Sequence, residues 1–270
     1  MATSSQSLSD RFTSLDEGQQ KWIIRIISLV VVLLVWEGVG RILGNIFFAP
    51  FSDVVVAYID LALNGEMFQT LINSIKEMLI AYALAVAVGI PVGLVMGRVR
   101  TVEQLLNPWV SAMFVTATAS LLPLFIIFFG IDLTFRLAIV FISSVWFILL
   151  NAYHGAKGVN LDFIDVGNSF NASRLKVMKD IVLPETLPYI FTGLRMGLIH
   201  ALRGIILAET FIAFGYGGMI HEYSLATADT APILALILTI MIFGYGMRIT
   251  LQRLQNRIFP WAEDSQSASH

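Results

Sequence analysis

The sequence predicts an all-α membrane protein with six transmembrane helices. Of its 270 residues, 57% are hydrophobic and only 13% are charged, and the mean hydropathy is +0.78. This composition is too apolar for an ordinary soluble domain. The apolar residues also form long runs, and a bilayer core about 30 Å thick needs roughly 20 of them per helix. We therefore expect the fold to be solvated by lipid.

Six windows are long and apolar enough to cross a bilayer. The second, third and sixth contain no charged residue. The first has its charges toward its ends, where Arg25 can snorkel to the interface, and the fourth has only Arg136, close to its start. The windows are Trp22 to Leu43, Met78 to Met96, Gln104 to Ile131, Leu133 to Tyr153, Leu187 to Phe214 and Ala231 to Met247.

The domain organisation follows from these windows. No small-residue cleavage pattern follows the first window, so we expect a retained anchor rather than a signal peptide. Residues 1–20 are rich in Ser, Gln and Asp and predict a flexible cytoplasmic tail. Residues 21–259 then form the transmembrane domain, with a long loop at about 152–185, and residues 260–270 form a cytoplasmic C-terminal tail.

The distribution of Lys and Arg predicts the orientation. These residues gather before the first window, in the loops after the second and fourth windows, and after the sixth. The alternate loops hold only Arg41 and Arg136. Six spans with both termini in the cytoplasm fit this pattern.

The loop at 152–185 has helical patterning of its own. It predicts one short helix before Asn171 and a second after it, with Ser173 as N-cap. Asn tolerates a left-handed backbone, which suits a break between helices, and Pro184 and Pro188 indicate a helix restart at the membrane surface. On spacing alone, a plain surface hairpin remains an equal alternative.

This loop resembles the cytoplasmic EAA loop of the permeases of binding-protein-dependent ABC transporters. The family pattern runs Glu-Ala-Ala, then a Gly, then Ile-x-Leu-Pro, and it falls here on Asp165, Val166, Gly167, Asn171, Ile181, Leu183 and Pro184. The Ile-x-Leu-Pro end matches directly, whereas an Asp replaces the Glu, Val-Gly replaces the two Ala, and an Asn replaces the Gly. Further similarity to the sulfonate, taurine, nitrate and bicarbonate branch appears in LLVWEGVGR, GIPVGLVMGR, LLPLFIIFFGI and GIILAE.

The resemblance implies a type I ABC importer permease fold, with cytoplasmic coupling helices between spans four and five. It implies ATPase-coupling roles for the loop residues Asp165, Val166, Gly167, Asn171, Ser173, Ile181, Leu183 and Pro184. It also implies the partners: a second copy of this chain, two ABC ATPase subunits and a periplasmic or lipid-anchored solute-binding protein, all at the plasma (inner) membrane and its lipid.

The chain is expected to be a transport subunit and not an enzyme. It contains no G-x-x-x-x-G-K-[ST] motif, so a P-loop of its own is excluded. ATP and Mg are therefore expected on the partner ATPase, with no cofactor in this chain. His154, His200 and His221 have no metal-ligand spacing, and no basic stripe with interleaved aromatics predicts nucleic-acid binding.

Span five combines a small-residue stripe with membrane-embedded charge. Gly193, Gly197 and Gly204 share one face, on which another helix could approach closely. His200 and Arg203 lie beside this stripe, and a charge near the bilayer centre costs about 2.5–3.5 kcal/mol unless it faces protein or water. Two interpretations stay open: the pair lines a pathway that favours an anion, or Arg203 pairs with a carboxylate or with helix carbonyls.

Two hydroxyl residues of span three are further pathway candidates. Thr116 and Ser120 precede Pro123, and the alternating hydroxyls of this stretch do not share one helical face. Either the helix is locally unwound there, where it could bind substrate, or Thr118 bonds back to its own backbone. Ordinary packing between helices is the other interpretation.

The function expected from this sequence is the pathway-forming subunit of an ATP-driven importer, with the loop at 160–184 as the coupling element. A small anion such as a sulfonate, nitrate, bicarbonate or an organic acid is the expected solute, and the residues do not choose among these. A secondary transporter or a channel-like membrane subunit is the alternative, although the inverted repeats typical of the former are not evident. The loop from Gly215 to Thr230 is expected to begin with a flexible turn at GYGG.

Overall fold

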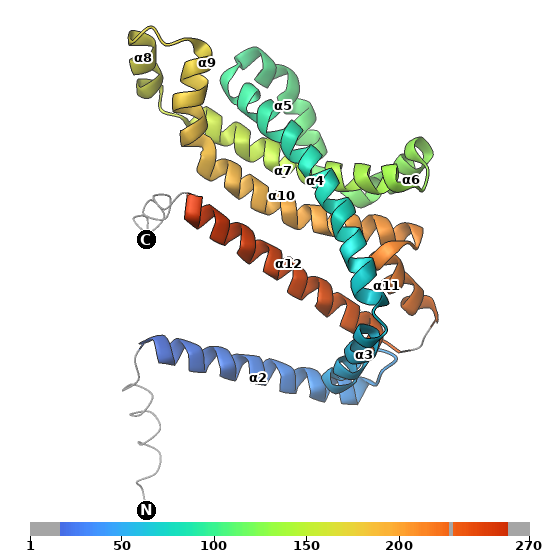
Figure 1. Cartoon of the computed structure of the whole chain (residues 1–270). Coiled ribbons are helices and arrows are strands. Elements are labelled where there is room, and N and C mark those ends of the chain that lie inside the picture. Colours follow the sequence, from blue (N-terminus) through green and yellow to red (C-terminus); the bar gives the residue numbers. More distant parts are fainter. Residues whose placement is uncertain (1–16, 227–228, 259–270) are drawn as a thin grey trace, which may run out of the picture. The chain divides into compact units, whose positions relative to one another are not determined.

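The computed structural model describes residues 17–226 and 229–258, and these residues are helical almost throughout (Figure 1). The helices in chain order are α2 (Glu17–Leu43), α3 (Phe51–Leu63), α4 (Glu66–Arg98), α5 (Arg100–Val115), α6 (Thr118–Phe129), α7 (Leu133–Gly158), α8 (Leu161–Ser169), α9 (Arg174–Val177), the π-helical turn η1 (Met178–Val182), α10 (Leu183–Ile212), α11 (Gly215–Ala226) and α12 (Ala231–Ile258). The predicted tails lie outside the described residues, except for residues 17–20, which already belong to α2.

The predicted spans correspond to five described helices and one broken pair. The helices around five of the windows are long and apolar enough to cross a membrane, whereas the third window is divided into α5 and α6, which are bent by 104°. A single straight helix over Gln104 to Ile131 is therefore wrong. The backbone is extended at Thr116 and Ala117, and both the backbone N–H and the hydroxyl of Thr116 donate to the Ala112 carbonyl, the hydroxyl at 2.8 Å. The locally unwound interpretation was correct.

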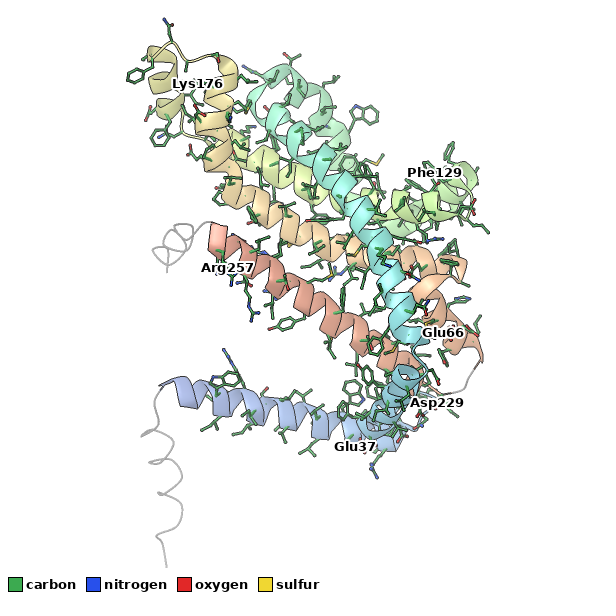
Figure 2. The ribbon with its side chains drawn as sticks, in the orientation of Figure 1. Glu37, Glu66, Phe129, Lys176, Asp229 and Arg257 are labelled. Carbon is green, nitrogen blue, oxygen red and sulfur yellow. The ribbon has the colours of Figure 1, made fainter. Side chains whose placement is uncertain are left out.

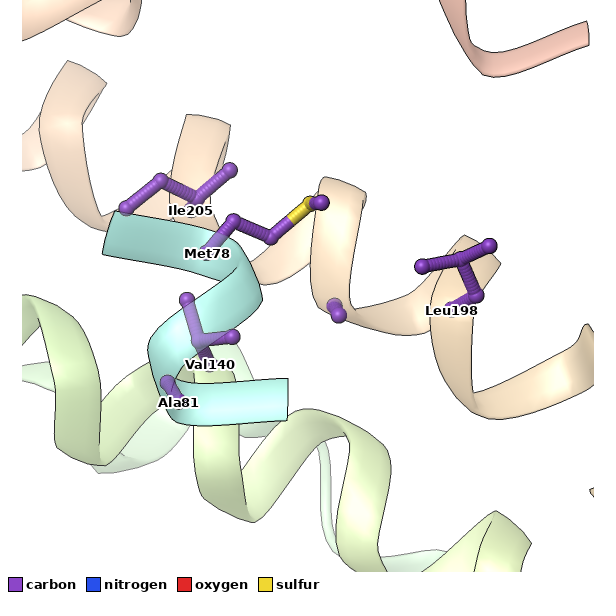
Figure 3. Close-up of a cluster of buried hydrophobic side chains, with 6 residues drawn as sticks. Met78, Ala81, Val140, Leu198 and Ile205 are labelled. Carbon is purple, nitrogen blue, oxygen red and sulfur yellow. The ribbon is translucent and has the colours of Figure 1, made fainter. Parts of the chain in front are cut away.

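The chain divides into two compact units, of which the larger comprises residues 64–222 and 237–270. Its centre is α7, which packs along its length against α4 and α10. Figure 3 shows one buried cluster of this unit, in which Met78 and Ala81 of α4 meet Val140 of α7 and Leu198 and Ile205 of α10. Burial of these apolar side chains holds three transmembrane helices in one body.

Glycines allow this close approach from both sides of α7. A Cβ added at Gly97 of α4 would lie 2.7 Å from the Cβ of Ala156, and one added at Gly197 of α10 would lie 2.8 Å from Cγ1 of Ile148. The other glycines that face α7 at similar range are Gly89, Gly93, Gly193 and Gly204. The stripe on α10 follows the spacing seen in the sequence, while the matching G-x-x-x-G-x-x-x-G stripe in GIPVGLVMG of α4 was missed and is readable by the same rule.

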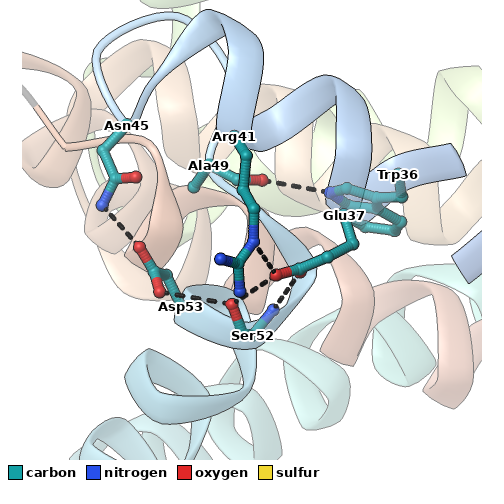
Figure 4. Close-up of polar contacts among 7 residues, drawn as sticks. All are labelled: Trp36, Glu37, Arg41, Asn45, Ala49, Ser52 and Asp53. Carbon is teal, nitrogen blue, oxygen red and sulfur yellow. Dashed lines mark hydrogen bonds and ion pairs between the residues drawn. The ribbon is translucent and has the colours of Figure 1, made fainter. Parts of the chain in front are cut away.

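The smaller unit contains α2, α3 and residues 223–236. Glu37 accepts hydrogen bonds from Ser52 and pairs with Arg41 at 2.7 Å, while the indole of Trp36 donates to the Ala49 carbonyl (Figure 4). The hydroxyl of Thr230 donates to the Asn45 carbonyl at 2.8 Å. The remaining apolar side chains of α2 are largely exposed around the helix, as expected for a helix surrounded by lipid.

The glycine contacts give a test of the packing. We expect Gly93→Ala to destabilise the folded chain by about 1–3 kcal/mol, because the new methyl group would overlap the Leu149 carbonyl and lie 2.8 Å from the Cβ of Ala152. Gly38→Ala in α2 is the matched control, since no atom lies within 4 Å of the added Cβ. Thermal unfolding in a mild detergent measures both variants, and equal midpoints would contradict the close approach.

Candidate functional site

The loop after α7 folds into a small helical module at one end of the α7 and α10 pair (Figure 2). Its two helices, α8 and α9, are separated by Asn171, whose φ of 56° is left-handed, as the sequence predicted. The N-cap prediction is also confirmed, because Ser173 Oγ accepts a hydrogen bond from the Lys176 N–H at 3.3 Å. Val177 and Val182 are buried against Ala156 at the end of α7, so the module has a core of its own. A plain hairpin is excluded.

The predicted helix restart at Pro184 and Pro188 is wrong. The chain passes from α9 through the π-turn η1 directly into α10, and residues 175–212 form one helical run. A proline cannot donate a backbone hydrogen bond, and a widened π-turn lets the helix continue past Pro184 without a break. The loop module is therefore continuous with the transmembrane helix that follows it.

Three large apolar side chains of the module point away from its core. Phe163 is 55% exposed, Phe170 is 82% exposed and Leu175 is 81% exposed. Val177, two positions after Leu175, is instead buried in the core of the module. We call Phe163, Phe170 and Leu175 the loop apolar face.

The residues on which the EAA pattern falls divide into two groups. Gly167 is buried, and a Cβ there would lie 2.9 Å from Cδ1 of Ile181, so α8 lies close to η1 at this position. Leu183 is half-buried, as Ile181 is. The exposed members, which lie on the surface of the module, are Asp165, Asn171, Ser173 and Pro184. The side chain of Val166 lies outside the described part of the structure.

A polar cluster that the sequence did not reveal joins this end of α7 to α5. Glu103 accepts a hydrogen bond from the Tyr153 hydroxyl at 2.6 Å and forms an ion pair with Lys157 at 2.5 Å. Arg98 of α4 donates to the Ala156 carbonyl at 3.2 Å. The partners are about 50 residues apart in the chain, so no local pattern connects them. They attach the first turn of α5 to the helix that carries the loop module.

The pathway candidates His200 and Thr116 lie near one aromatic stack. The His200 ring stacks on Phe147 of α7 with centroids 3.7 Å apart, and Phe147 contacts Phe114 of α5 edge-on at 5.1 Å. Thr116 follows Phe114 by two residues, at the break between α5 and α6. Ser120 is exposed on α6. The stack therefore connects His200 to the broken span.

Arg203 faces a different environment, a groove between α10 and α12 with a volume of about 660 Å³. Most of the groove wall is apolar, with side chains such as Leu202 and Ile240. Arg248 of α12 lines the same groove, whereas His200, Thr116 and Ser120 do not. The structure thus separates Arg203 from the other three pathway candidates and brings it to a second arginine that sequence analysis had treated only as an orientation signal.

The other embedded charges have structural partners. Arg136 of α7 makes a two-pronged ion pair with Glu77 of α4, at 2.6 and 2.8 Å, and its guanidinium lies 4.2 Å from the centre of the Phe214 ring. The buried Glu209 accepts a hydrogen bond at 2.9 Å from the Gly217 N–H in the first turn of α11. An acidic side chain at a helix N-terminus is stabilised by the exposed N–H groups and the helix dipole.

The GYGG segment is not the flexible turn that we expected. It forms the first turn of α11, and Gly215 has a φ of +62° with the Glu209 carboxylate against its backbone. A Cβ at Gly217 would lie 2.6 Å from the Ile206 carbonyl. The glycines serve close packing of α11 onto α10.

Comparison with known proteins identifies the class to which this fold belongs. Residues 89–260 match the family described as binding-protein-dependent transport system inner membrane component. The chain is 31% identical to the taurine transport system permease protein TauC of Escherichia coli K12 over 247 residues, which cover 88% of this chain and 90% of that relative. It is 26% identical to the bicarbonate transport system permease protein CmpB of Synechococcus elongatus, over 71% of this chain and 75% of that relative.

The solved structures agree on the fold. A chain of the MetNI methionine ABC transporter, in an inward-facing conformation, superposes with a TM-score of 0.66 at 13% identity, over 73% of this chain and 98% of that chain. The protein belongs to the binding-protein-dependent ABC transport permeases, in the branch that the sequence resembled, and has the type I importer fold. It is a multi-pass inner-membrane transport subunit. This family membership argues against the alternative interpretation of the sequence as a secondary transporter.

The Arg136 and Glu77 ion pair gives a second test. Glu77→Leu alone should destabilise the chain by about 3 kcal/mol, because it leaves a guanidinium with only 8% side-chain exposure without its carboxylate. The double variant Glu77→Leu with Arg136→Met should recover most of that loss, since no charge is then left uncompensated. Thermal unfolding of the wild type, both single variants and the double variant measures this. Simple addition of the two single effects would argue against the pairing.

Proposed function

We propose that two copies of this chain form the translocation pathway of an importer, and that the loop module transmits ATP hydrolysis from a separate pair of ATPase subunits. A solute-binding protein delivers the solute from the outer side. ATP and Mg bind to the ATPases, and this chain supplies no catalytic group. The family membership supports the ATPase and binding-protein partners. The sequence has no P-loop motif, which supports the proposal that a separate subunit hydrolyses ATP.

The loop apolar face is the observation that carries the coupling role. Phe163, Phe170 and Leu175 lie on a module that the positive-inside rule places in the cytoplasm, away from lipid. Large apolar side chains exposed to water on one small module indicate a candidate protein-binding site. The exposed residues of the EAA pattern, Asp165 and Asn171, lie on the same module. An ATPase docked here would act directly on α7 and α10, between which the module is inserted.

Copurification tests the coupling role. A tagged wild-type chain, expressed with its neighbouring genes, should bring down a P-loop ATPase in a one-to-one ratio, in particles with two copies of each. Phe170→Ser with Leu175→Ser should lose the ATPase, because the contact surface becomes polar.

The matched control is Phe47→Ser with Leu225→Ser. Both residues are about as exposed as the loop pair. Phe47 lies between α2 and α3, and Leu225 lies near the end of α11, in segments that the predicted orientation places outside. The control should retain the ATPase. Loss of the ATPase in both pairs, or in neither, would contradict docking at the loop apolar face.

The orientation can be tested directly, because the chain contains no cysteine. A single cysteine in place of the exposed Lys176 should be protected from a membrane-impermeant maleimide in intact cells and labelled after permeabilisation. A cysteine in place of the exposed Glu222 should be labelled in intact cells. The reverse pattern would place the loop module outside the cytoplasm and remove the coupling proposal.

We propose an anion as the solute, with Arg203 as a pathway contact and with His200, Thr116 and Ser120 as further contacts. Two observations support this. Arg203 lines a groove and forms none of the ion pairs found among the described residues. The substrates named for the two relatives, taurine and bicarbonate, both carry an acidic group.

A further inference from the structure

The groove between α10 and α12 combines two positive charges with an apolar wall. Arg203 and Arg248 both line it, and the hydroxyl groups of Thr210 and Tyr245 are the other polar side chains at its wall. The rest of the lining is apolar, with side chains such as Leu202, Ile206, Ile240 and Met241, and Gly244 of α12 faces Leu202. Its volume of about 660 Å³ is within the usual range of small-molecule pockets, roughly 300–1,000 Å³.

The two guanidinium groups lie at similar levels along the helix axes, so both can contact one ligand. Leu202 of α10 lies opposite Gly244 of α12, since a Cβ on that glycine would be 2.7 Å from Cδ2 of Leu202. Arg203 lies one residue to one side of this level and Arg248 lies four residues to the other. At 1.5 Å rise per residue, their axial separation is about 7.5 Å. One acidic group can bind either arginine, and a ligand of moderate length can reach from one to the other.

The carboxylates of the spans do not explain these arginines. Four of these carboxylates already have partners: Glu37 pairs with Arg41, Glu77 pairs with Arg136, Glu103 pairs with Lys157, and Glu209 accepts a hydrogen bond from the first turn of α11. Within the described ranges, the ion pairs include neither Arg203 nor Arg248. Both arginines are exposed at the groove, so an anion that enters it can reach their guanidinium groups, and a charge at membrane depth is stabilised by such a partner.

We propose that this groove binds an organic anion with an apolar body, with its acidic group on Arg203 and Arg248 and its body against the aliphatic wall. The proposal rests on the proposed import of an anion and narrows it. A compact hydrated anion such as nitrate or bicarbonate would lose its water to a wall that offers few replacement hydrogen bonds. An alkyl or aryl sulfonate or carboxylate gains from burial of its apolar part and forms charge-assisted hydrogen bonds to guanidinium.

Equilibrium dialysis of benzenesulfonate against the assembled transporter in nanodiscs tests this, with empty nanodiscs as background. The wild type should bind benzenesulfonate, while nitrate, methanesulfonate and benzyl alcohol should each compete at least about tenfold more weakly. Arg203→Gln should weaken binding about tenfold or more, and Arg248→Gln several-fold, as loss of a charge-assisted hydrogen bond implies. Arg203→Lys should restore part of the affinity. Arg195→Gln, on α10 but outside the groove, is the matched control and should bind normally.

The outcomes separate this proposal from the proposed function. Wild-type affinity in Arg203→Gln and Arg248→Gln would overturn the site. Nitrate binding as tight as benzenesulfonate, and equally sensitive to Arg203→Gln, would overturn the apolar class and leave the import of an anion in place. Binding of benzyl alcohol as tight as benzenesulfonate would show that charge is not recognised and would overturn the site. A wild-type complex that retains its ATPase and binds none of these anions would overturn the site without affecting the importer assignment.

Discussion

The close approach of α4 and α10 to the two sides of α7 is the constraint on which the larger unit depends. In lipid no hydrophobic effect drives helices together, so association depends on van der Waals packing and on hydrogen bonds between them. Six glycines, three on each neighbouring helix, leave room for the backbone and side chains of α7. The polar residues of α7 do not interfere with this packing, because Ser143 and Ser144 bond back to carbonyls of their own helix. Larger residues at the glycine positions would separate all three helices.

Because α7 is held on both sides, it connects features that are far apart in the chain. Its C-terminal end carries the loop module and, through Tyr153 and Lys157, contacts the first turn of α5. Further along it, Phe147 contacts Phe114 of α5 and the His200 ring of α10. The same α5 ends at the break before α6. Contacts of α7 with α5 at two levels mean that one helix supports both α5 and the loop module.

The sequence predicted the parts of the fold that depend on local chemistry. Apolar runs gave the positions of the spans because the bilayer sets their length. Asn171 and Ser173 indicated a break and a cap because these residue types favour those backbone conformations. The bend at Thr116 was recognised only as one of two possibilities, since a threonine that bonds back to its own helix can distort the helix or leave it intact. The continuity of α9 with α10 was missed because a π-turn has no simple sequence signature and the prolines argued for a restart.

Most of the candidate site depends on tertiary contacts and was beyond reach of the sequence. The partner of Arg136 is Glu77 and that of Glu103 is Lys157, and both pairs join residues more than 50 positions apart. Arg248 illustrates the same limit, because in the sequence it is simply the first of three basic residues after the last span. Only the packing of α12 against α10 brings it to the groove that Arg203 lines. An unpaired charge in a membrane helix can be recognised from sequence, but whether its counter-ion is a side chain or a solute is decided by the fold. In this chain four carboxylates of the spans have other partners, and the ion pairs of the described residues include neither Arg203 nor Arg248, which is why we propose an anion from outside the chain as their charge partner.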